Sequence, residues 1–411
     1  MSFDKSKTRE GKLVTLGKSL VKRKQVQRLS TKISEFDLVL GGGLISDSVV
    51  LIAGSPGVGK STLLLQAANK LAEDMKVIYI SGEETLSQVR ERSCRLGYKD
   101  SEILFSSETN LKTILRILRK EKPKVFIIDS IQAIFNPDIS SLPGMPSQVK
   151  SCAIDILNFA KKIGIACFVL GHVVKGEKLA GPKALEHIVD TVLYFEETSL
   201  LRILRAHKNR FGSTNEVGMF RMGEKGLEEI SNPSELFLEG RVSRPGSVVV
   251  TLVQGSRVLA LEVQSLLSQN RNQQKQIVGL NSSRVLMLLN ILETLYRLPL
   301  RNFSITLSVP GGLSVLDSSA DLGIVCSLVS SFRHDPISSK VAVIGEVGLG
   351  GEIRRVPALE KRIETLRKLG FEKIIVSQLP STFKQNIEGV KEVKNIEEGV
   401  NEVFEYSISR G

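Results

Sequence analysis

The 411-residue sequence contains no tryptophan and only four cysteines, Cys94, Cys152, Cys167 and Cys326. No two cysteines form a CxxC pair, and the four histidines are also scattered, so the sequence predicts no zinc site and no other cysteine-based metal site. Isolated cysteines of this kind are typical of a reducing compartment, and we expect Cys152 and Cys167 to lie in the core.

Long apolar runs are absent as well. No segment approaches the roughly 18 consecutive apolar residues of a membrane-spanning helix. The first residues, MSFDKSKTREGK, do not resemble a secretory signal. These absences disfavour membrane and secreted proteins, and they predict a cytoplasmic protein without a membrane partner.

Positive charge is in excess, since 56 lysines and arginines against 44 acidic residues give a net charge of +12 and a pI near 9.5. Such a balance favours an anionic partner, and we expect nucleic acid rather than a membrane surface. Residues 1–29 are basic and polar. They form either a solvated tail or an arm that contacts phosphates.

The length of the chain predicts two domains. Over residues 30–235, apolar strands such as VVLIAG (49–54) and TVLYFE (191–196) alternate with helical stretches, which indicates a parallel sheet covered by helices on both faces. Proline, serine and glycine gather over residues 231–245 and mark the boundary. A second, smaller α/β domain is expected over residues 236–411.

The segment GSPGVGKST has the spacing of a phosphate-binding P-loop between an apolar strand and a helix. Its glycines let backbone N–H groups approach phosphate oxygens at the electropositive start of the helix. We expect ATP and Mg²⁺ as cofactors, with Lys60 on the β and γ phosphates and Ser61 on the metal. The residues expected to contact the nucleotide are Gly54, Ser55, Pro56, Gly57, Val58, Gly59, Lys60, Ser61 and Thr62.

Carboxylates follow two further strands. Asp129 ends the strand VFIID, where a magnesium-organising carboxylate is expected, although a capping role would also place an aspartate there. Glu83 and Glu84 follow the strand VIYIS. We choose Glu83 as the residue that activates the attacking water, because it is the first carboxylate beyond the strand; a solvated loop pair is the alternative.

His172 closes the strand ACFVLGH and is either a structural histidine or a sensor of the γ phosphate at the sheet edge where ligands gather. The loops that follow Asp129 and His172, FNPDISSLPGMPSQVK and VVKGEKLAGPK, leave the same edge. They are either mobile loops or DNA contacts. The candidate DNA-binding residues of the second loop are Lys175, Lys178 and Lys183.

Lys208 and Arg210 lie two residues apart in LLRILRAHKNRFG, so their side chains share one face if the strand continues. The P-loop already supplies a lysine to its own nucleotide. We therefore expect the pair to reach the nucleotide of a neighbouring subunit in a ring, where such a finger accelerates hydrolysis by about 10³–10⁵. A basic strand edge that deters aggregation is the alternative.

The segments LIAGSPGVGKSTLLLQ, YISGEETLSQVRERSCRLG, GHVVKGEKLAGPKALEHIVDTVLYFE and LRAHKNRFGSTNEVG together resemble the RadA (Sms) family of bacterial DNA repair proteins. The resemblance extends from about residue 30 to the end, and KNRFG is the signature of the family. It implies a RecA-type ATPase that forms a homo-hexamer around single-stranded DNA and drives branch migration of recombination intermediates. Lys60, Ser61, Glu83, Asp129 and the pair Lys208 and Arg210 match its functional positions.

Members of this family usually begin with a four-cysteine zinc finger, which the sequence does not contain. Contacts that depend on the finger, including engagement of RecA, are therefore left open.

The second domain, with GEVGLGGEIRRVPALEKRI and LDSSADLGI, is similar to the proteolytic domain of Lon. Ser319 matches the nucleophile, but Glu360 stands where the catalytic lysine is expected, and a carboxylate cannot replace that base. We expect an inactive, ring-forming platform whose basic residues bind DNA backbone or form a solvated helix face: Arg354, Arg355, Lys361 and Arg362. The rival functions are an ATP-dependent Lon-like protease and a regulatory ATPase of the clock type.

Overall fold

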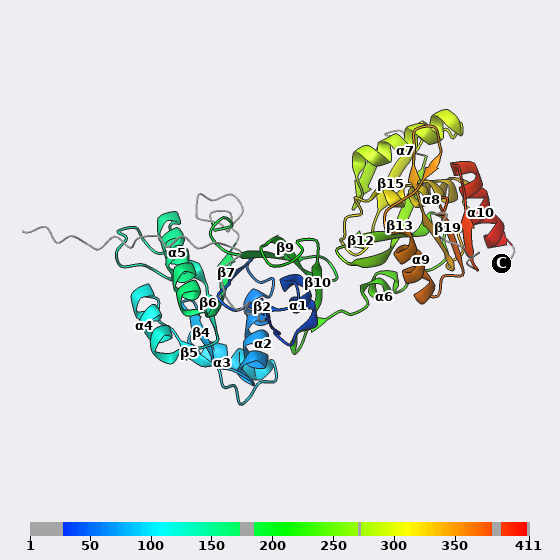
Figure 1. Ribbon diagram of the computed structural model, residues 1–411. Coiled ribbons are helices and arrows are strands. Elements are labelled where there is room, and N and C mark those ends of the chain that lie inside the picture. The colour runs from blue at the N-terminus through cyan, green and yellow to red at the C-terminus, as the bar shows by residue number, and fades with distance from the viewer. Residues whose placement is uncertain (1–27, 173–184, 270–272, 380–387, 409–411) are drawn as a thin grey trace, which may run out of the picture.

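The computed structural model describes residues 28–172, 185–269, 273–379 and 388–408. Two large sheets, each with its own helices, organise these residues, and the segment that carries α6 (Pro233–Leu238) joins them (Figure 1). The expected α/β class is confirmed. Among the described residues, no helix has the length and apolar character needed to cross a membrane.

The first sheet has nine strands in the order β11-β10-β9-β8-β3-β7-β6-β4-β5. The strands from β8 to β5 run parallel, whereas β9, β10 and β11 extend the sheet as antiparallel hairpins. The bounds are β3 (Val49–Gly54), β4 (Val77–Ser81), β5 (Leu104–Ser106), β6 (Val125–Asp129), β7 (Ala166–His172), β8 (Thr191–Glu197), β9 (Arg202–Asn209), β10 (Val217–Gly223) and β11 (Gly226–Glu229).

The central strands of this sheet are apolar throughout, so both of its faces are covered by helices. Val50 and Ile52 of β3 pack into the cluster that contains α1 and α2, whereas Val49 and Leu51 pack into the cluster on the opposite face, with α4 and α5. Cys152 and Cys167 are fully buried there, as expected. The helices are α1 (Ser34–Leu40), α2 (Lys60–Ala72), α3 (Leu86–Arg95), α4 (Leu111–Glu121) and α5 (Pro146–Ile163), with the short 3₁₀ turn η1 (Ile131–Ala133).

The N-terminal arm expected over residues 1–29 lies outside the described residues except for its last two. Arg28 and Leu29 form β1 (Arg28–Leu29), which pairs with β2 (Leu44–Ile45). This ribbon lies against the first sheet, since Arg28 Nη2 donates a hydrogen bond to the carbonyl of Phe211 at 2.6 Å.

The second sheet has seven strands in the order β14-β15-β13-β12-β16-β19-β20. One of its faces packs on α7, α8 and α10, and the other packs on α9. The bounds are β12 (Ser247–Gln254), β13 (Arg257–Ser268), β14 (Lys275–Val278), α7 (Ser282–Leu295), η3 (Leu300–Asn302), β15 (Ser304–Ser308), η4 (Ser318–Ala320), α8 (Asp321–Arg333), β16 (Val341–Ile344), β17 (Glu346–Val347), β18 (Ile353–Arg354), α9 (Leu359–Lys368), β19 (Lys373–Val376), β20 (Val390–Glu392) and α10 (Ile396–Ile408).

Candidate nucleotide site and its relatives

The P-loop connects β3 to α2 at the carboxyl edge of the first sheet. Gly54 ends β3, and a Cβ atom there would lie 2.4 Å from the carbonyl oxygen of Phe195. Gly59 caps α2 with a φ of 110°, a left-handed conformation that favours glycine. The loop therefore depends on these glycines to close tightly over the electropositive start of the helix, where an anion is stabilised.

Lys60 is buried at the first turn of α2. Its Nζ donates hydrogen bonds to the carbonyls of Gly54 at 2.9 Å and Ser55 at 3.0 Å. Burial lowers the pKa of this lysine, while the nearby carboxylates of Asp129 and Glu83 oppose the shift. An ammonium group held over the loop, facing two carboxylates, is well placed to contact a phosphate bound by the loop.

Asp129 ends β6 in register with Ser81 of the adjacent β4. Its side chain is buried, and Tyr79 donates a hydrogen bond to its Oδ2 at 2.6 Å. Burial raises the pKa of Asp129, and hydrogen bonds from Tyr79 and Ser61 oppose that shift. The structure thus brings Ser61 and Asp129 together as an oxygen pair that fits Mg²⁺, which takes its remaining ligands from phosphate and water.

Glu83 lies just beyond β4 and faces the ends of two neighbouring strands. It accepts a hydrogen bond from the hydroxyl of Ser130, and its Oε1 lies 3.3 Å from Nε2 of His172. The proximity of His172 lowers the pKa of Glu83, burial opposes that shift, and the hydrogen bond from Ser130 adds to the lowering. Glu84 instead pairs with Arg92 on α3, so Glu83 is the carboxylate of the two that borders His172 and the P-loop edge.

Lys208 and Arg210 both turn toward the segment that precedes β8. Lys208 Nζ donates to the carbonyls of Glu186 at 2.6 Å and Val189 at 2.8 Å, and Arg210 Nη1 lies 3.2 Å from the buried carboxylate of Asp190. Burial, with a smaller contribution from Arg210, lowers the pKa of Lys208. The two cations therefore do share one side, although β9 ends at Asn209.

These cations lie at the opposite end of the sheet from the P-loop. Asp190 accepts a hydrogen bond from the backbone N–H of Val49, the first residue of β3, whereas Gly54 is the last. The length of β3, roughly 16 Å at about 3.3 Å per residue, separates the two ends. Within one chain, the structure does not bring Arg210 to the P-loop.

The glycine-rich turn after α1 packs directly on the segment that follows Arg210. A Cβ atom on Gly212 would lie 3.0 Å from the Cα of Gly41. Between these motifs, Asn209 Nδ2 donates to the carbonyls of Val39 at 3.4 Å and Leu40 at 3.3 Å. The LGGGL and KNRFG segments, far apart in sequence, therefore form one packed unit.

Sequence reasoning missed several supporting residues, because no motif marks them. Tyr79 is an interior strand residue, and only the register of β4 with β6 directs its hydroxyl to Asp129. Asp190, a fixed partner of Arg210, also accepts from Lys161 at 3.1 Å. A polar residue at the end of an otherwise apolar strand pattern is the signal that would have directed attention to Asp190 and to Ser130.

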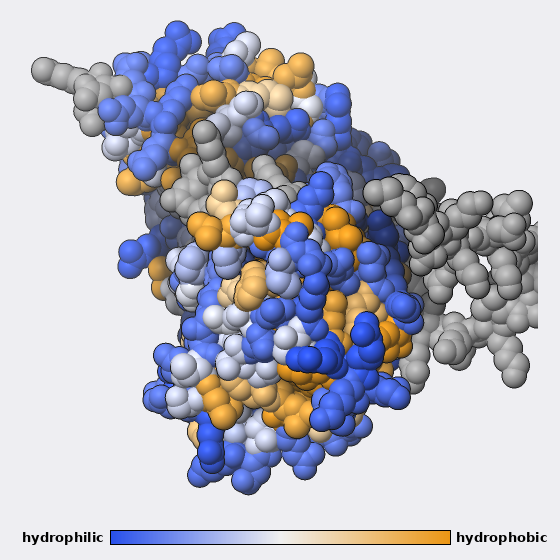
Figure 2. All heavy atoms as spheres, turned by 90° about the vertical axis from the view of Figure 1, so that its left-hand side faces the viewer, coloured by the Kyte–Doolittle hydropathy of each residue, from blue (hydrophilic) through white to orange (hydrophobic). Residues whose placement is uncertain are grey.

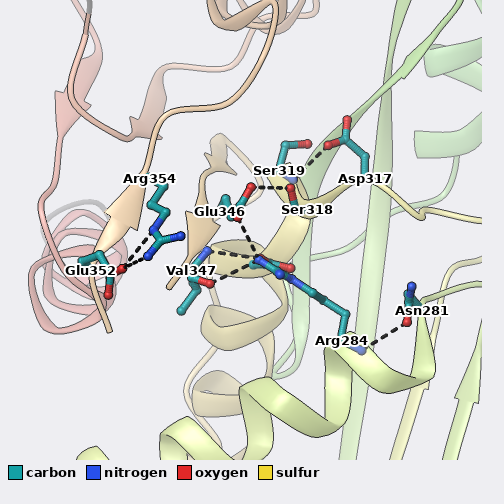
Figure 3. A network of polar contacts seen from close by, with 10 residues as sticks. Asn281, Arg284, Asp317, Ser318, Ser319, Glu346, Val347, Glu352 and Arg354 are labelled. Carbon is teal, nitrogen blue, oxygen red and sulfur yellow. Dashed lines mark hydrogen bonds and ion pairs between the residues drawn. The ribbon is translucent and has the colours of Figure 1, made fainter. Parts of the chain in front are cut away.

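The residues expected to contact DNA differ in their surroundings. Lys175, Lys178 and Lys183 lie outside the described residues. Arg354 is exposed and pairs with Glu352 at 2.5 Å (Figure 3), and Arg355 is also exposed. The inclusion of Arg362 in that basic surface is wrong, since its side chain is 1% exposed and faces the interior of the second domain.

Arg362 instead contacts Ser319, the serine expected from the sequence to match the Lon nucleophile. Its Nη1 donates to Oγ of Ser319 at 2.7 Å, and its Nη2 pairs with Asp317. Ser319 is fully buried and donates to the carbonyl of Thr251 at 3.2 Å. Glu360 is exposed on the same helix as Arg362, and no contact joins it to Ser319 within the described part of the chain.

A second polar cluster adjoins this serine. Figure 3 shows Ser318 directed toward Glu346, which in turn faces Arg284. Arg284 also pairs with the buried Asp321 at 2.5 Å, the first residue of α8. These contacts fix η4 and the start of α8 from two sides, so the Ser319 backbone has little freedom.

Comparisons with known proteins agree with this architecture. Residues 29–106 match the KaiC family of ATPases, and residues 296–408 match the C-terminal proteolytic domain of Lon protease. The P-loop and the segment around Glu83 fall in the first match, and Ser319 falls in the second.

Several curated relatives resemble the chain over most of its length. The DNA repair protein RadA of Halalkalibacterium halodurans is 44% identical over 362 residues, covering 87% of this chain and 79% of the relative. RadA of Pseudomonas aeruginosa is 42% identical over 388 residues (93% and 85%), and RadA of Bacillus subtilis is 43% identical over 376 residues (90% and 81%). The chain therefore belongs to the RadA family, the DNA repair ATPases of the RecA type.

Proposed function

We propose that this chain is a DNA-dependent motor that binds single-stranded DNA and drives branch migration of recombination intermediates. In this proposal it works as a homo-hexameric ring with ATP and Mg²⁺ at each subunit boundary. The ATPase unit spans residues 30–235, and a Lon-like platform spans residues 236–411. Membership of a family of DNA repair ATPases and the nucleotide site described above support it.

The proposed roles follow from the chemistry of each group. Lys60 and the P-loop backbone hold the phosphates, and Ser61 with Asp129 holds the metal, which neutralises phosphate charge when bound. Glu83, with a lowered pKa, is ionised near neutral pH and accepts the proton of the attacking water. His172, 3.3 Å from Glu83, senses the γ phosphate through this carboxylate.

The position of Lys208 and Arg210 is the main observation that supports the proposal of a ring. Both lie at the amino end of a strand system whose carboxyl end holds the P-loop. A cation there cannot contact the γ phosphate of its own subunit, because the length of β3, roughly 16 Å, separates them. In a head-to-tail ring the amino edge of one subunit faces the nucleotide of the next, and that arrangement gives both residues a target.

A subunit-mixing experiment tests this proposal. Lys60→Ala removes the phosphate lysine but keeps the finger, and Lys208→Ala does the reverse. Each variant alone should hydrolyse ATP slowly, with a loss of up to about 10³–10⁵ for the finger. Mixed in equal amounts, they should recover about a quarter of wild-type activity if pairing across the heterologous interfaces is random.

If the mixture of the two variants recovers no ATPase activity, the finger does not act between subunits. Lys208→Ala should still bind a fluorescent ATP analogue as tightly as wild type, since its own P-loop is intact. A mixture of Lys60→Ala with a Lys60→Ala, Lys208→Ala double variant is the control, because it contains no intact P-loop and should stay inactive.

DNA dependence separates the motor from a clock-type regulatory ATPase. The motor predicts that single-stranded DNA raises turnover and that its affinity falls with salt, by a slope of about 0.7 for each phosphate neutralised. The loops after Asp129 and His172 are the proposed contacts, and Arg354 and Arg355 extend them on the second domain. An ATPase rate that ignores DNA, together with salt-independent binding, favours the regulatory alternative.

We also propose that the Lon-like domain cleaves no peptide. Arg362, the buried partner of Ser319, is a guanidinium with N–H donors and no acceptor, so it cannot take up the serine proton as a general base. The Ser319 hydroxyl is buried and already donates to Thr251. Casein incubated with the protein and ATP should stay intact, and cleavage that Ser319→Ala abolishes would establish the protease instead.

A further inference from the structure

The solvent-facing side of α4 carries a stripe of positive charge. Lys112, Arg116, Arg119 and Lys120 are all exposed and, at intervals of three and four residues, lie along one side of the helix. The opposite side packs into the core through Leu111, Ile114 and Leu118. From Lys112 to Lys120 the stripe extends over about 12 Å of helix.

This stripe is costly for the helix, which sets it apart from an ordinary solvated face. Lys112, Arg116 and Lys120 are spaced four apart, and like charges at that spacing destabilise a helix by about 0.2–0.5 kcal/mol per pair. No acidic residue lies between Leu111 and Lys120. By contrast, α9 interleaves its charges, as in the pair of Glu364 with Lys368 at 2.7 Å.

Among the residues that the structure describes, most of these cations have no acidic partner. Over the described ranges, Arg116, Arg119 and Lys120 form no ion pair, and Arg119 lies over the ring of Phe159 with 5.7 Å to its centroid. The C-terminal position of Arg119 and Lys120 favours them through the helix dipole, but Arg116 in the middle gains little from it. Figure 2 shows that hydrophilic residues cover much of the end of the molecule that includes α4 and α5.

The stripe begins at one of the loops proposed to contact DNA. Lys112 pairs with Asp138 at 2.5 Å, within the loop that follows Asp129, and an isolated bridge joins Asn110 to Phe135. From there α4 leads to the opposite edge of the sheet, where Lys122 and Lys124 are also exposed. A nucleic acid held at the loop can therefore continue along the helix.

We propose that the cations of α4 bind the phosphate backbone of a duplex DNA arm next to the single strand that the motor holds. The inference rests on the proposed function, because it assigns that motor a second contact. The stripe exposes no aromatic side chain, since Phe159 is 5% exposed, so it offers no platform on which unpaired bases stack. Cations on a convex helix instead suit the regular backbone of a duplex.

The test uses a double variant that carries both Arg116→Gln and Lys120→Gln, and it compares this variant with the wild type. Fluorescence anisotropy would follow three labelled DNAs over a salt series: a single strand, the same strand with a duplex arm, and a blunt duplex. The variant should lose the affinity that the duplex arm adds, and its salt slope for armed DNA should fall by about 2, close to 0.9 for each lost phosphate contact. Binding of the single strand and ATPase without DNA should not change.

The matched control is Arg90→Gln with Arg95→Gln, which removes two exposed cations from α3 on the opposite face of the same sheet. It should bind all three DNAs as wild type does. An equal loss in the control would show a mere effect of net charge and overturn the inference, as would an unchanged affinity of the α4 variant for armed DNA. Because the substitutions relieve repulsion within α4, thermal unfolding should occur at the same or a higher temperature.

Two further outcomes have distinct meanings. The α4 variant could lose binding to polyglutamate while it still binds duplex DNA. That result would indicate that the stripe binds an acidic protein, and it would overturn the inference. If single-stranded DNA fails to stimulate wild-type ATPase, the proposed motor fails, whereas the α4 result still reports on the duplex contact by itself.

Discussion

At the scale of single residues, the orientation of Asp129 depends on a neighbour that no motif marks. The phenol of Tyr79 is fully enclosed and donates its hydrogen bond to Oδ2 of Asp129 at 2.6 Å. A buried carboxylate is costly unless such donors compensate it. Tyr79 therefore holds the carboxylate that we propose binds the metal in one rotamer, and it lowers the free-energy cost of keeping that carboxylate ionised.

Tyr79→Phe tests this role. We expect the Mg²⁺ concentration that half-saturates ATPase to rise by about 5–30-fold, the equivalent of 1–2 kcal/mol for one lost hydrogen bond to a buried group. Mg²⁺-dependent binding of a fluorescent ATP analogue should weaken in parallel, which a defect in hydrolysis alone would not cause. Tyr98→Phe, which alters a half-buried tyrosine outside the site, should leave both values at wild-type level.

Individual site residues could be predicted where a local sequence motif specifies their positions. The P-loop spacing predicted Lys60 and Ser61, and the end of an apolar strand predicted Asp129 beside them. Tyr79 and Asp190 were not predictable, because their roles arise from the order of β4, β6 and β3 in the sheet. Arg362 was misjudged because a charged residue on an amphipathic helix is usually exposed, and here Asp317 compensates its burial.

At the scale of elements, the junction of η4 with α9 depends on one ion pair. Asp317 accepts hydrogen bonds from Arg362 and from the backbone N–H of Ser319 at 3.0 Å. Burial raises the pKa of Asp317, but the hydrogen bond and charge of Arg362 and the hydrogen bonds from Ser319 together outweigh burial and leave the pKa below the ordinary value of 3.8. The pair therefore contributes to stability only while the carboxyl is ionised.

This shift predicts how stability depends on pH. Because the pKa of Asp317 is lower in the folded chain than in the unfolded chain, its contribution is complete above about pH 4 and is lost as the pH falls through the folded value. Asp317→Asn should lower the free energy of unfolding at neutral pH by about 3–5 kcal/mol, since it leaves Arg362 buried without an anion. In denaturant titrations from neutral pH to about pH 3, the difference in unfolding free energy between wild type and variant should shrink as the pH falls.

The exposed Asp138 provides the control, since its pair with Lys112 is solvated. Asp138→Asn should cost less than about 1 kcal/mol at any pH. A difference between Asp317→Asn and wild type that persists at acid pH would show that the loss comes from packing and not from the charge.

The elements themselves were predictable where local pattern and tertiary context agree. The parallel strands β3, β6 and β7 follow from continuous apolar runs, and α2 follows from the P-loop. The longest of the described strands, β13, has no clear strand pattern, because RVLALEVQSLLS contains strong helix formers such as Leu, Ala, Glu and Gln. Its pairing with β12 and β15 on both sides overrides that propensity.

At the scale of the whole molecule, the two sheets share one hydrophobic cluster. Leu201, Ile203 and Met219 of the first sheet region pack together with Leu252 and Leu259 of the second. The turn between β12 and β13 reaches the loop that follows the finger, since Ser256 Oγ lies 2.8 Å from the carboxylate of Glu216. The Lon-like domain therefore directly contacts the loop that follows Lys208 and Arg210 and leads to β10. No local sequence pattern predicts this arrangement.

Arg257 forms a bidentate ion pair across this contact. Its guanidinium donates to both oxygens of Glu35 on α1, at 2.8 and 2.6 Å, and Glu35 also accepts from the backbone N–H of Met219 at 3.0 Å. The Glu35 side chain is 4% exposed, so it depends on these donors. Since α1 packs on β9 and β10, this ion pair connects the second domain to the base of the finger.

Arg257→Ala should therefore uncouple the two domains. Leaving Glu35 buried without its cation should cost about 3–5 kcal/mol, and calorimetry should show two separate unfolding transitions in place of a joint one. ATP binding should persist while turnover falls, because the finger loses its support and the P-loop does not. Arg221→Ala, which breaks an exposed pair with Glu228, should change stability by less than about 1 kcal/mol. A joint transition with full turnover in Arg257→Ala would mean that the shared apolar cluster alone couples the domains.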